Sequence, residues 1–465
     1  MVEAPRLWSA NRPRVNDRRT HVVVIGGGFG GLTLARELST RARREHLRVT
    51  LVDRRNHHTF QPLLYQVATA GLQPQDIGMP LRALLRRRGV RVRLGDVIGV
   101  KGEEKQLVFS DGSQMGYDKL VLAAGAVSSD FGIPGVAEHA FGLKSLADAT
   151  TLRNHVLRVF EEASARPDKV EPGDLTFVVA GGGPTGVEMA GALAELVDLV
   201  IRRDHPTLDV SRVRIVQIEL MDRLLGGFSE RSSHQASRDL RRRGVEVQLG
   251  TGIAAAGPDQ VELTNGDVIA TKTLVWAAGV AASPIASALD VELGRGRRLP
   301  VDGRLRLTAD GYDDVYAIGD IAASEDYDGS LLPQVAPVAI QHGRYVAKVL
   351  GADAGADERP GPFRYTDKGA MATVGRASGV VELPQGLRFG GPFAWFAWLV
   401  LHLLQLVGFK NRFRVLVAWA WNYLTYDHSA RLILDQKEAD TTEADRGPVR
   451  RSWADPPSTP PTHDD

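Results

Sequence analysis

Three glycines near the start of the chain have the spacing that binds a pyrophosphate. Gly26, Gly28 and Gly31 follow an apolar run at residues 21–25, and residues 32–38 continue with helical spacing. In such a strand, turn and helix, the first glycine permits a tight turn and the second lets the backbone approach phosphate, while the third lets the helix pack closely on the strand. The positive end of the helix dipole then faces the phosphates. The pattern predicts a dinucleotide site.

An acidic residue stands where this unit needs a partner for ribose. Residues 48–52 have the character of a second strand, and Asp53 ends it, 27 residues after Gly26. A carboxylate in that place accepts hydrogen bonds from a ribose diol. A glycine-rich turn that serves packing alone is the competing interpretation, and the order of strand, helix and terminal acid disfavours it.

The same pattern occurs a second time. Gly181, Gly183 and Gly186 follow the apolar run 176–180, and Glu219 ends the next predicted strand. The offsets between the copies are nearly constant, at 155 positions from Gly26 to Gly181 and from Gly95 to Gly250, and 154 from Gly112 to Gly266 and from Gly125 to Gly279. A chance match would not preserve these offsets. We therefore predict a duplicated α/β fold with two dinucleotide-binding, Rossmann-like domains.

A later segment suggests which nucleotide each domain binds. Residues 315–320 read as a strand and a turn with Gly319 and Asp320, whose carboxylate could bind a polyol such as flavin ribitol. Because this segment follows the second copy, the second domain is predicted to be inserted into the first. We assign FAD to the first domain and NADH to the second. Glu219 would repel a 2′-phosphate and favours NADH, although the nearby Arg223 leaves NADPH open.

Composition narrows the classes of function. A chain of 465 residues has room for two to four domains of roughly 100–200 residues. It has no cysteine, which excludes disulfides, thiolate nucleophiles, Cys-ligated zinc, iron–sulfur clusters and redox dithiols, so redox chemistry needs a bound cofactor. The net charge of +1 predicts no nucleic-acid partner. His57 and His58 lack a convergent third ligand, and no metal site is predicted.

Two aromatic stretches near the C-terminus predict membrane contact. Phe393–Phe409 contains no formal charge in seventeen residues, and as a helix it would span about 26 Å, short of the roughly 30 Å of a bilayer core. Basic residues at 410–414 precede a second stretch, 415–426, rich in Trp and Tyr, which gather at headgroup depth. We predict two helices lying in one leaflet, a monotopic attachment through roughly 393–426. A buried core pair, a homodimer interface and a single span are the alternatives.

These residues resemble a known family, the type II NADH:quinone oxidoreductases, over roughly residues 20–435. The most specific parts are the stretches 53–71, 181–188 and 367–375 and the aromatic C-terminal segment. The resemblance implies that FAD is held by Gly26, Gly28, Gly31, Asp53, Val97, Gly125, Gly319 and Asp320, with Val97 against adenine. It implies that NADH is held by Gly181, Gly183, Gly186, Glu219 and Gly279.

The resemblance also supplies two candidate catalytic residues. It places Glu188 close to the nicotinamide and the flavin, where an acid could position the dihydronicotinamide or relay a proton. The alternative is an acid that only complements the helix dipole. In the family's quinone-site helix, Ala-Gln-x-Ala-x-Gln, the first glutamine is Pro337 here, so Gln341 carries the predicted quinone site. Proline is acceptable near a helix start.

The predicted function is transfer of hydride from NADH to flavin and then of two electrons to a membrane quinone, menaquinone or ubiquinone, without proton pumping. The expected location is the cytoplasmic face of the cell membrane, and a homodimer is expected. One alternative is a two-site flavoprotein reductase that passes electrons from NAD(P)H to a soluble acceptor. Another is a flavin-bearing redox sensor with negligible turnover.

The predicted domain layout has six parts. They are a basic leader without export-signal character (1–20), the first part of the FAD-binding domain (21–145), the NADH-binding domain (146–299), the second part of the FAD-binding domain (300–360), the C-terminal membrane-attachment region (361–435) and a disordered tail (436–465).

Overall fold

The computed structural model describes residues 19–425 and 430–433. Almost all of the predicted leader and the whole predicted tail lie outside these residues. Contacts divide the chain into two compact units, which we describe separately. The first contains the residues up to Asn56 with Leu81–Gly125 and Ile285–Tyr365, and the second contains His57–Pro80, Ala126–Pro284 and the residues from Thr366 onward. The predicted domain bounds remain a prediction.

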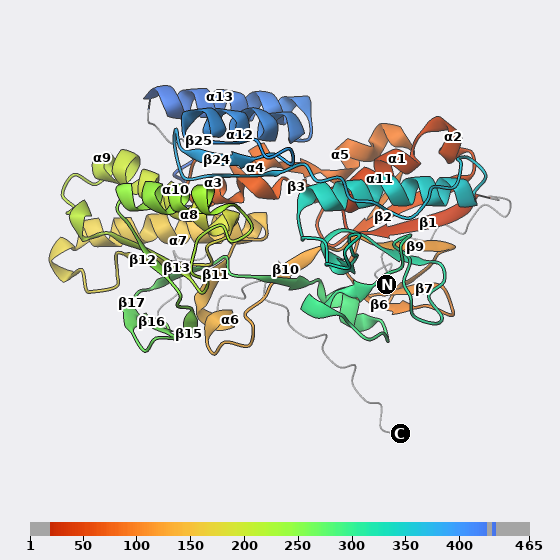
Figure 1. Cartoon of the computed structure of the whole chain (residues 1–465), viewed down its shortest axis with the longest axis horizontal. Coiled ribbons are helices and arrows are strands. Elements are labelled where there is room, and N and C mark those ends of the chain that lie inside the picture. Colours follow the sequence, from red (N-terminus) through yellow and green to blue (C-terminus); the bar gives the residue numbers. More distant parts are fainter. Residues whose placement is uncertain (1–18, 426–429, 434–465) are drawn as a thin grey trace, which may run out of the picture. The chain divides into compact units, whose positions relative to one another are not determined.

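A parallel five-stranded sheet forms the centre of the first unit (Figure 1). Its strands, in spatial order, are β21 (Val315–Ala317), β9 (Lys119–Leu122), β1 (Thr20–Ile25), β2 (Leu47–Asp53) and β5 (Arg91–Leu94). Val22, Val23 and Val24 in β1 are fully buried, as expected for a central strand of a covered parallel sheet. Because β21 follows the second repeat along the chain, the second unit interrupts the first, and the predicted insertion is confirmed.

Two helices of the first unit cross at glycines. They are α1 (Phe29–Leu38) and α11 (Ala336–Asp353), which pack against each other. A Cβ added to Gly343 would lie 2.5 Å from the carbonyl oxygen of Gly30, and one added to Gly30 would lie 3.2 Å from that of Ala339. The helices approach this closely because neither crossing position carries a side chain.

Smaller elements complete the first unit. An antiparallel sheet contains β6 (Val97–Lys101), β7 (Gln106–Phe109) and β8 (Gln114–Gly116). The others are α2 (Arg41–Arg44), α5 (Leu81–Leu85), β20 (Leu299–Pro300) and β22 (Ala322–Ala323).

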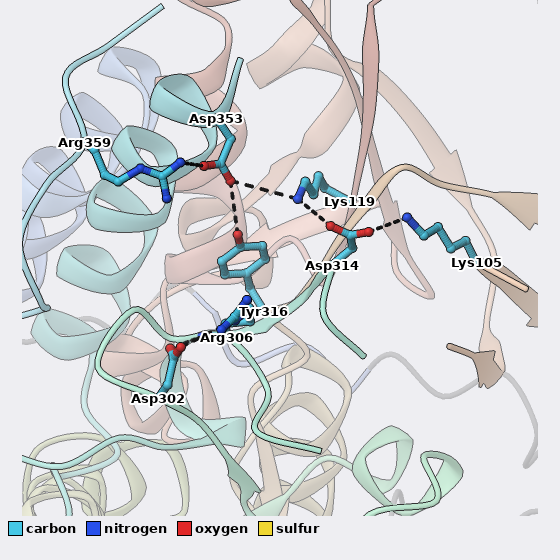
Figure 2. Close-up of polar contacts among 8 residues, drawn as sticks. All are labelled: Lys105, Lys119, Asp302, Arg306, Asp314, Tyr316, Asp353 and Arg359. Carbon is cyan, nitrogen blue, oxygen red and sulfur yellow. Dashed lines mark hydrogen bonds and ion pairs between the residues drawn. The ribbon is translucent and has the colours of Figure 1, made fainter. Parts of the chain in front are cut away.

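A polar network joins the sheet of the first unit to the end of α11 (Figure 2). Asp314, just before β21, accepts hydrogen bonds from Lys105 and Lys119. Asp353, the last residue of α11, pairs with Arg359 at 2.6 Å and accepts a hydrogen bond from the hydroxyl of Tyr316 at 3.4 Å. Burial raises the pKa of Asp314, but the two lysines outweigh burial and the pKa is lowered overall. The charges are therefore mutually satisfied within the network.

The second unit repeats this architecture. Its parallel sheet has the spatial order β11 (Ala140–Gly142), β18 (Thr273–Trp276), β12 (Thr176–Ala180), β13 (Arg214–Glu219) and β14 (Val245–Leu249). A three-stranded antiparallel sheet again follows, with β15 (Ile253–Ala256), β16 (Gln260–Leu263) and β17 (Val268–Ala270). Side chains of both sheets form one buried apolar cluster that includes Val178, Val216, Leu274, Val261 and Leu263. Four strands of the first sheet (β9, β1, β2, β5) and four of the second (β18, β12, β13, β14) have the same spatial order and the same order along the chain, which confirms the predicted duplication.

The remaining elements of the second unit cover its sheet and add a C-terminal layer. The helices are α3 (Leu64–Ala68), α4 (Pro74–Ile77), α6 (Val136–His139), α7 (Leu146–Ala165), α8 (Pro184–Leu196), α9 (Arg202–Asp204), α10 (Glu230–Arg242), α12 (Pro392–Gln405) and α13 (Phe409–Thr425). The strands are β3 (His57–Thr59), β4 (Gly78–Pro80), β10 (Ala126–Ser128), β19 (Val280–Ala282), β23 (Ala370–Thr373), β24 (Gly379–Glu382) and β25 (Arg388–Gly390). Helix α12 packs against β23, β24 and β25 and against α13 (Figure 1).

Candidate functional site

The first glycine turn connects β1 to α1. Gly26 has a φ of +105°, and a Cβ added there would lie 2.3 Å from the carbonyl oxygen of Ala123. A Cβ added to Gly31 would lie 1.9 Å from the carbonyl oxygen of Gly26. Gly28 is the N-cap of α1, and a Cβ there would meet no atom of the described residues within 4 Å. The turn is therefore closed on its inner side, while Gly28 faces open space at the helix N-terminus.

Asp53 holds this turn from the end of β2. Its Oδ2 accepts a hydrogen bond from the amide of Gly27 at 2.6 Å, and its Oδ1 accepts one from the amide of Arg55 at 2.7 Å. Each carboxylate oxygen has two lone pairs and can accept a further bond. The carboxylate thus fixes the turn and still has acceptor capacity for a ribose hydroxyl, although the ribose contact itself stays a prediction.

The second glycine turn, between β12 and α8, has the same design. Gly181 also has a φ of +105°, and a Cβ on Gly186 would lie 1.8 Å from the carbonyl oxygen of Gly181. Gly183 is the N-cap of α8, and an added Cβ there would again meet nothing within 4 Å in the described part of the chain. Pro184 starts the helix, where a missing amide proton costs nothing.

Glu219 takes the place of Asp53 in the second turn. Its Oε2 accepts a hydrogen bond from the amide of Gly182, and its Oε1 accepts one from the amide of Met221 at 2.8 Å. Both acids therefore bind the amide that follows the first glycine and the amide two residues after themselves. Gly279 follows β18, and a Cβ on it would lie 2.1 Å from the ring of Phe131.

The other residues predicted to bind flavin mostly lie at one edge of the first sheet. Strands β1, β2, β9 and β21 are parallel, so their carboxyl ends meet at the same edge. Gly125 follows β9, and Gly319 and Asp320 follow β21. Ligands of doubly wound sheets bind outside this edge. Val97 lies in β6 of the antiparallel sheet and is buried.

Sequence reasoning gave no role to His342, which the structure places against the Gly319 turn. The amide of Gly319 donates a hydrogen bond to Nδ1 of His342 at 3.0 Å, and Ser324 Oγ lies 3.3 Å from the other ring nitrogen. Burial lowers the pKa of His342 to about 3, so the ring is neutral. His342 therefore fixes the backbone beside Asp320 as an uncharged acceptor. A single histidine in a helical stretch gives no pattern from which this role could be predicted.

Gln341 lies in the first half of α11 and is half-buried. The helix begins at Ala336, and Pro337 is its second residue, so the departure from the family pattern is compatible with the helix start. Gln341 belongs to the first unit, whereas the other candidate catalytic residue, Glu188, belongs to the second.

Glu188 is the fifth residue of α8, and its side chain is buried. Its Oε1 accepts a hydrogen bond from the amide of Thr373 at 3.3 Å, and the Trp398 side chain also bonds to the carboxyl group. Burial raises the pKa of Glu188 to about 8, more than these two bonds lower it. The carboxyl group is therefore mainly protonated at neutral pH. A solvated acid that only complements the helix dipole would not be buried in this way.

Three residues around Glu188 were missed as site residues by sequence reasoning. They are Tyr65 on α3, Thr373 on β23 and Trp398 on α12. The Tyr65 hydroxyl lies 3.3 Å from Thr373 Oγ1, and the rings of Tyr65 and Trp398 meet edge to face with centroids 6.1 Å apart. Tyr65 and Thr373 lie within two of the stretches that carry the family resemblance, which was the available signal.

Helix α13 carries two asparagines on its buried side. Asn411, Trp419 and Asn422 are buried, and the two asparagines donate hydrogen bonds to backbone carbonyls of the segment 57–80. The opposite side exposes large apolar side chains, with Phe409 at 84% and Leu424 at 81% exposure. A helix on the surface of a water-soluble protein has the reverse arrangement.

Helix α12 presents a similar apolar face. It exposes Phe393, Phe396, Val400 and Leu404, while Trp398 is buried. We call α12 and α13 the C-terminal helical pair. None of the described helices is both long enough and apolar enough to cross a membrane.

Two expectations for this region are corrected. The first stretch was expected to form a helix over Phe393–Phe409, but α12 ends at Gln405. Helix α13 begins at Phe409, so the basic residues at 410–414 lie in its first turns. Trp398 and Trp419 pack inward because their ring N–H groups bond to Glu188 and Gln66, and phenylalanine and leucine make up most of the exposed apolar face instead.

Comparison with known proteins decides the family. A model of the pyridine nucleotide-disulphide oxidoreductases matches residues 20–343, and a model of the NDH2 C-terminal domain matches residues 368–426. A type II NADH:quinone oxidoreductase of Mycobacterium tuberculosis is 39% identical, with 90% of this chain and 91% of the relative aligned. The chain belongs to the type II NADH:quinone oxidoreductases. The predicted family and enzyme class are confirmed.

Other members of the family and a solved structure agree. A second type II NADH:quinone oxidoreductase of Mycobacterium tuberculosis is 38% identical over 90% of both chains. A mitochondrial internal alternative NAD(P)H-ubiquinone oxidoreductase of Arabidopsis thaliana is 30% identical over 90% of this chain and 87% of its own length. The structure of NDH2 from Plasmodium falciparum in complex with NADH covers 90% of this chain and 100% of its own, with a TM-score of 0.79 and 19% identity. This likeness confirms the predicted α/β fold.

The wider family takes its name partly from a disulphide, which this type II NADH:quinone oxidoreductase cannot form. It has no cysteine, so its redox chemistry does not pass through a protein dithiol. Electrons must instead pass between bound cofactors and substrates.

Proposed function

We propose that this chain transfers hydride from NADH to a flavin in the first unit's site and passes two electrons on to a membrane quinone, without pumping protons. The observation that carries the proposal is the pair of equivalent turns, each with a glycine facing open space at a helix N-terminus and an acid beside it. Family membership supports NADH as donor and quinone as acceptor, because the relatives carry both in their names.

The residues at the carboxyl edge of the first sheet fit FAD. Gly26 and Gly31 shape the turn, Gly28 leaves room for a pyrophosphate, and the helix N-terminus opposes its charge. We propose that Asp53 accepts from the adenosine ribose and Asp320 from the ribityl chain, with Gly125 and Gly319 giving close approach and Val97 against adenine. Bound there, the flavin would accept hydride from NADH and pass electrons on.

The second turn fits NADH in the same way. We propose that Gly181, Gly183 and Gly186 hold its pyrophosphate, with Glu219 at the ribose and Gly279 beside it. A negative carboxylate at that ribose repels a 2′-phosphate, which supports NADH over NADPH. Glu188 is proposed to hold a proton at neutral pH in this unit, available for transfer when the charge around it changes.

The C-terminal helical pair supports attachment to one leaflet of a membrane. Its exposed face is apolar, its inner face is hydrogen-bonded to the protein, and residues 392–425 contain no acid. Lys410 and Arg414 are exposed and would attract anionic lipid headgroups. We propose that quinone enters from this lipid and that Gln341 contributes to its site. The cytoplasmic face of the cell membrane and a homodimer are part of the same proposal.

One experiment tests the electron path. The enzyme is purified in detergent, its flavin spectrum is recorded, and NADH is titrated without oxygen. Menaquinone and ubiquinone analogues are then added separately to the reduced enzyme. We expect NADH to bleach the flavin and at least one quinone to restore its colour. A bleached flavin that ignores both quinones but recovers with air or a ferredoxin would overturn the proposal.

A further inference from the structure

A chain of side-chain hydrogen bonds leads from α13 to the neighbourhood of Glu188. Trp419 Nε1 donates to Gln66 Oε1 at 2.7 Å, and Gln66 Nε2 donates to the hydroxyl of Tyr65 at 3.0 Å. That hydroxyl lies 3.3 Å from Thr373 Oγ1, and the amide of the same threonine donates to Glu188 Oε1 at 3.3 Å. Trp419 and Gln66, which are 353 positions apart in the sequence, are thus joined directly by a hydrogen bond.

The orientation of the Gln66 amide in this chain is fixed by Trp419. An indole N–H can only donate, so the oxygen of the Gln66 amide must face Trp419 and its NH₂ group must face Tyr65. The Tyr65 oxygen therefore accepts from Gln66, and either of the Tyr65 and Thr373 hydroxyls can donate to the other. Burial raises the pKa of Tyr65 well above its usual value, so the hydroxyl stays protonated.

Helix α12 reaches the same carboxyl group by a shorter route. Trp398 bonds directly to Glu188, and its ring stacks on His402 with centroids 4.0 Å apart. Burial lowers the pKa of His402 to about 4, so the stacked ring carries no charge at neutral pH. Both members of the C-terminal helical pair are therefore linked to one buried acid.

Burial and two hydrogen bonds, from the Thr373 amide and the Trp398 side chain, set the pKa of Glu188, and no charged side chain of the described residues is among its causes. On α8 itself, Glu195 lies two turns further along and is paired with Arg243 at 3.2 Å. The elements packed against α8 carry the following titratable groups: Tyr65 on α3, Asp198 in the helical turn after α8, Arg214 and Glu219 on β13, Glu246 on β14, and Glu230, Arg231, His234, Arg238, Asp239, Arg241 and Arg242 on α10. The C-terminal helical pair adds His402 and Tyr423. Uncharged hydrogen-bond donors thus dominate the immediate surroundings of the Glu188 carboxyl.

We propose that Tyr65 and Gln66 are positioning residues that support the hydrogen bond from the Thr373 amide to Glu188 and thereby couple this carboxyl group to the contact that Trp419 of α13 makes with Gln66. Only the role of Glu188 in turnover rests on the proposed function. The hydrogen-bond chain does not depend on the proposed function. Because α13 carries the exposed apolar face, the surface that contacts lipid and the buried acid belong to one connected unit.

The hydrogen-bond donors around Glu188 affect the pKa of its carboxyl group. An N–H that donates to a carboxylate stabilises the charged form and makes the proton easier to release. Pairing of β23 with β24 also holds the Thr373 backbone. If Gln66 no longer holds Tyr65, the Thr373 side chain loses its contact with the Tyr65 hydroxyl, and the 3.3 Å hydrogen bond from the Thr373 amide to Glu188 is weakened. The acid then holds its proton more tightly.

The test is a direct titration of Glu188 in the oxidised holoenzyme, without NADH or quinone. Infrared difference spectra follow the carbonyl stretch of the protonated carboxyl, which is assigned by its absence in Glu188→Gln. We expect Gln66→Leu and Tyr65→Phe each to raise the midpoint of this titration by about half a unit to one unit, the effect of weakening one hydrogen bond to the carboxylate.

Asn411→Leu is the matched control. It removes amide hydrogen bonds between α13 and the same segment, to the carbonyls of Gln75 and Gly78 at 3.3 Å, but lies outside the chain that leads to Glu188. We expect its titration to match the wild type. Thermal unfolding and flavin content establish that each variant is folded, and Tyr65→Phe, which loses only one oxygen, carries the test if Gln66→Leu does not fold.

The outcomes separate this inference from the proposed function. Midpoints in Gln66→Leu and Tyr65→Phe that equal the wild type, or an equal shift in Asn411→Leu, would overturn the coupling even if the enzyme reduces quinone normally. Shifted midpoints in the first two variants alone would support it even if Glu188 proved dispensable for turnover.

Discussion

The two nucleotide units share a turn but differ in the helix that follows it. In both, a glycine at φ +105° starts the turn, a later glycine contacts its carbonyl oxygen, and an acid binds the same two amides. Helix α1 then packs on α11 through Gly30 and Gly343. Helix α8 packs instead on β23 and buries Glu188. Thr33 stands 155 positions before Glu188, at the equivalent place in α1.

This difference shows where the duplicated units diverged. The turn tolerates no change at its inner glycines, because the contacts there are with backbone. The outer side of the following helix is free to acquire a new partner, and in the second unit that partner is the layer that leads to the C-terminal helical pair. Glu188 thus lies between the glycine turn, which both units have, and the C-terminal layer, which only the second unit has.

The largest effect is expected when alanine replaces the last glycine of either turn, Gly31 in one variant and Gly186 in another. The added Cβ would lie 1.9 Å from a carbonyl oxygen in Gly31→Ala and 1.8 Å in Gly186→Ala, so either turn must open at a cost of about 3 kcal/mol. We expect Gly31→Ala to be isolated without flavin. We expect Gly186→Ala to keep its flavin but to be reduced by NADH about 100-fold more slowly, the rate equivalent of that cost. Flavin absorbance and stopped-flow reduction measure the two effects.

Alanine at the open positions provides the control. In Gly28→Ala and Gly183→Ala the new Cβ meets no described atom within 4 Å, so both proteins should unfold at the wild-type temperature. Any loss of nucleotide binding in them then reports contact with the ligand itself. Loss of flavin from Gly186→Ala but not from Gly31→Ala would reverse the assignment of the two sites.

The second effect concerns the acid that only the second unit buries. The folded-state pKa of Glu188 is raised from 4.5 to about 8, so the unfolded chain releases this proton at lower pH than the folded one. The wild type therefore loses stability as pH rises from about 4.5 to 8, on the order of 3 kcal/mol by pH 7, and Glu188→Gln does not. Urea unfolding across this pH range measures the slope.

The matched change in the first unit is Thr33→Val, which should leave the pH dependence of unfolding as in the wild type. Glu188→Gln should also slow turnover while retaining flavin. Equal slopes in Glu188→Gln and wild type would mean that the carboxyl group is ionised in the folded protein at neutral pH. If Glu188→Gln turned over at the wild-type rate, Glu188 would have only a structural role.

The third prediction tests the exposed apolar face of the C-terminal helical pair, which belongs to the second unit. Phe409→Ser with Leu424→Ser removes two side chains that contact water over more than four-fifths of their surface. We expect sedimentation with anionic lipid vesicles to weaken about 30-fold, since each apolar side chain buried in lipid contributes about 1–2 kcal/mol. The thermal midpoint should not change. Val268→Ser, which alters an exposed apolar residue on β17, is the control, and equal vesicle binding by all three proteins would contradict the proposed attachment.

The repeated glycine turns could be predicted from the sequence, but the contacts between segments far apart in the chain could not. The turns around Gly26 and Gly181 could be predicted because their spacing is set by local backbone geometry, and the constant offsets revealed the duplication. The inward orientation of Trp398 and Trp419 could not, because it depends on hydrogen bonds to Glu188 and Gln66 from elements far apart in the chain. His342 was missed for the same reason.

The smallest effect separates the two acids that hold the turns. Asp53 and Glu219 bind equivalent amides, but we propose that only Glu219 faces a ribose whose phosphorylation distinguishes two substrates. Glu219→Gln keeps an oxygen for the amide of Gly182 and removes the negative charge, so the ratio of kcat/KM for NADH to that for NADPH should fall about three- to tenfold, because less repulsion acts on the 2′-phosphate. Asp53→Asn should weaken flavin retention and leave this ratio unchanged. A ratio that falls in Asp53→Asn but stays constant in Glu219→Gln would mean that the nicotinamide nucleotide binds at the first turn.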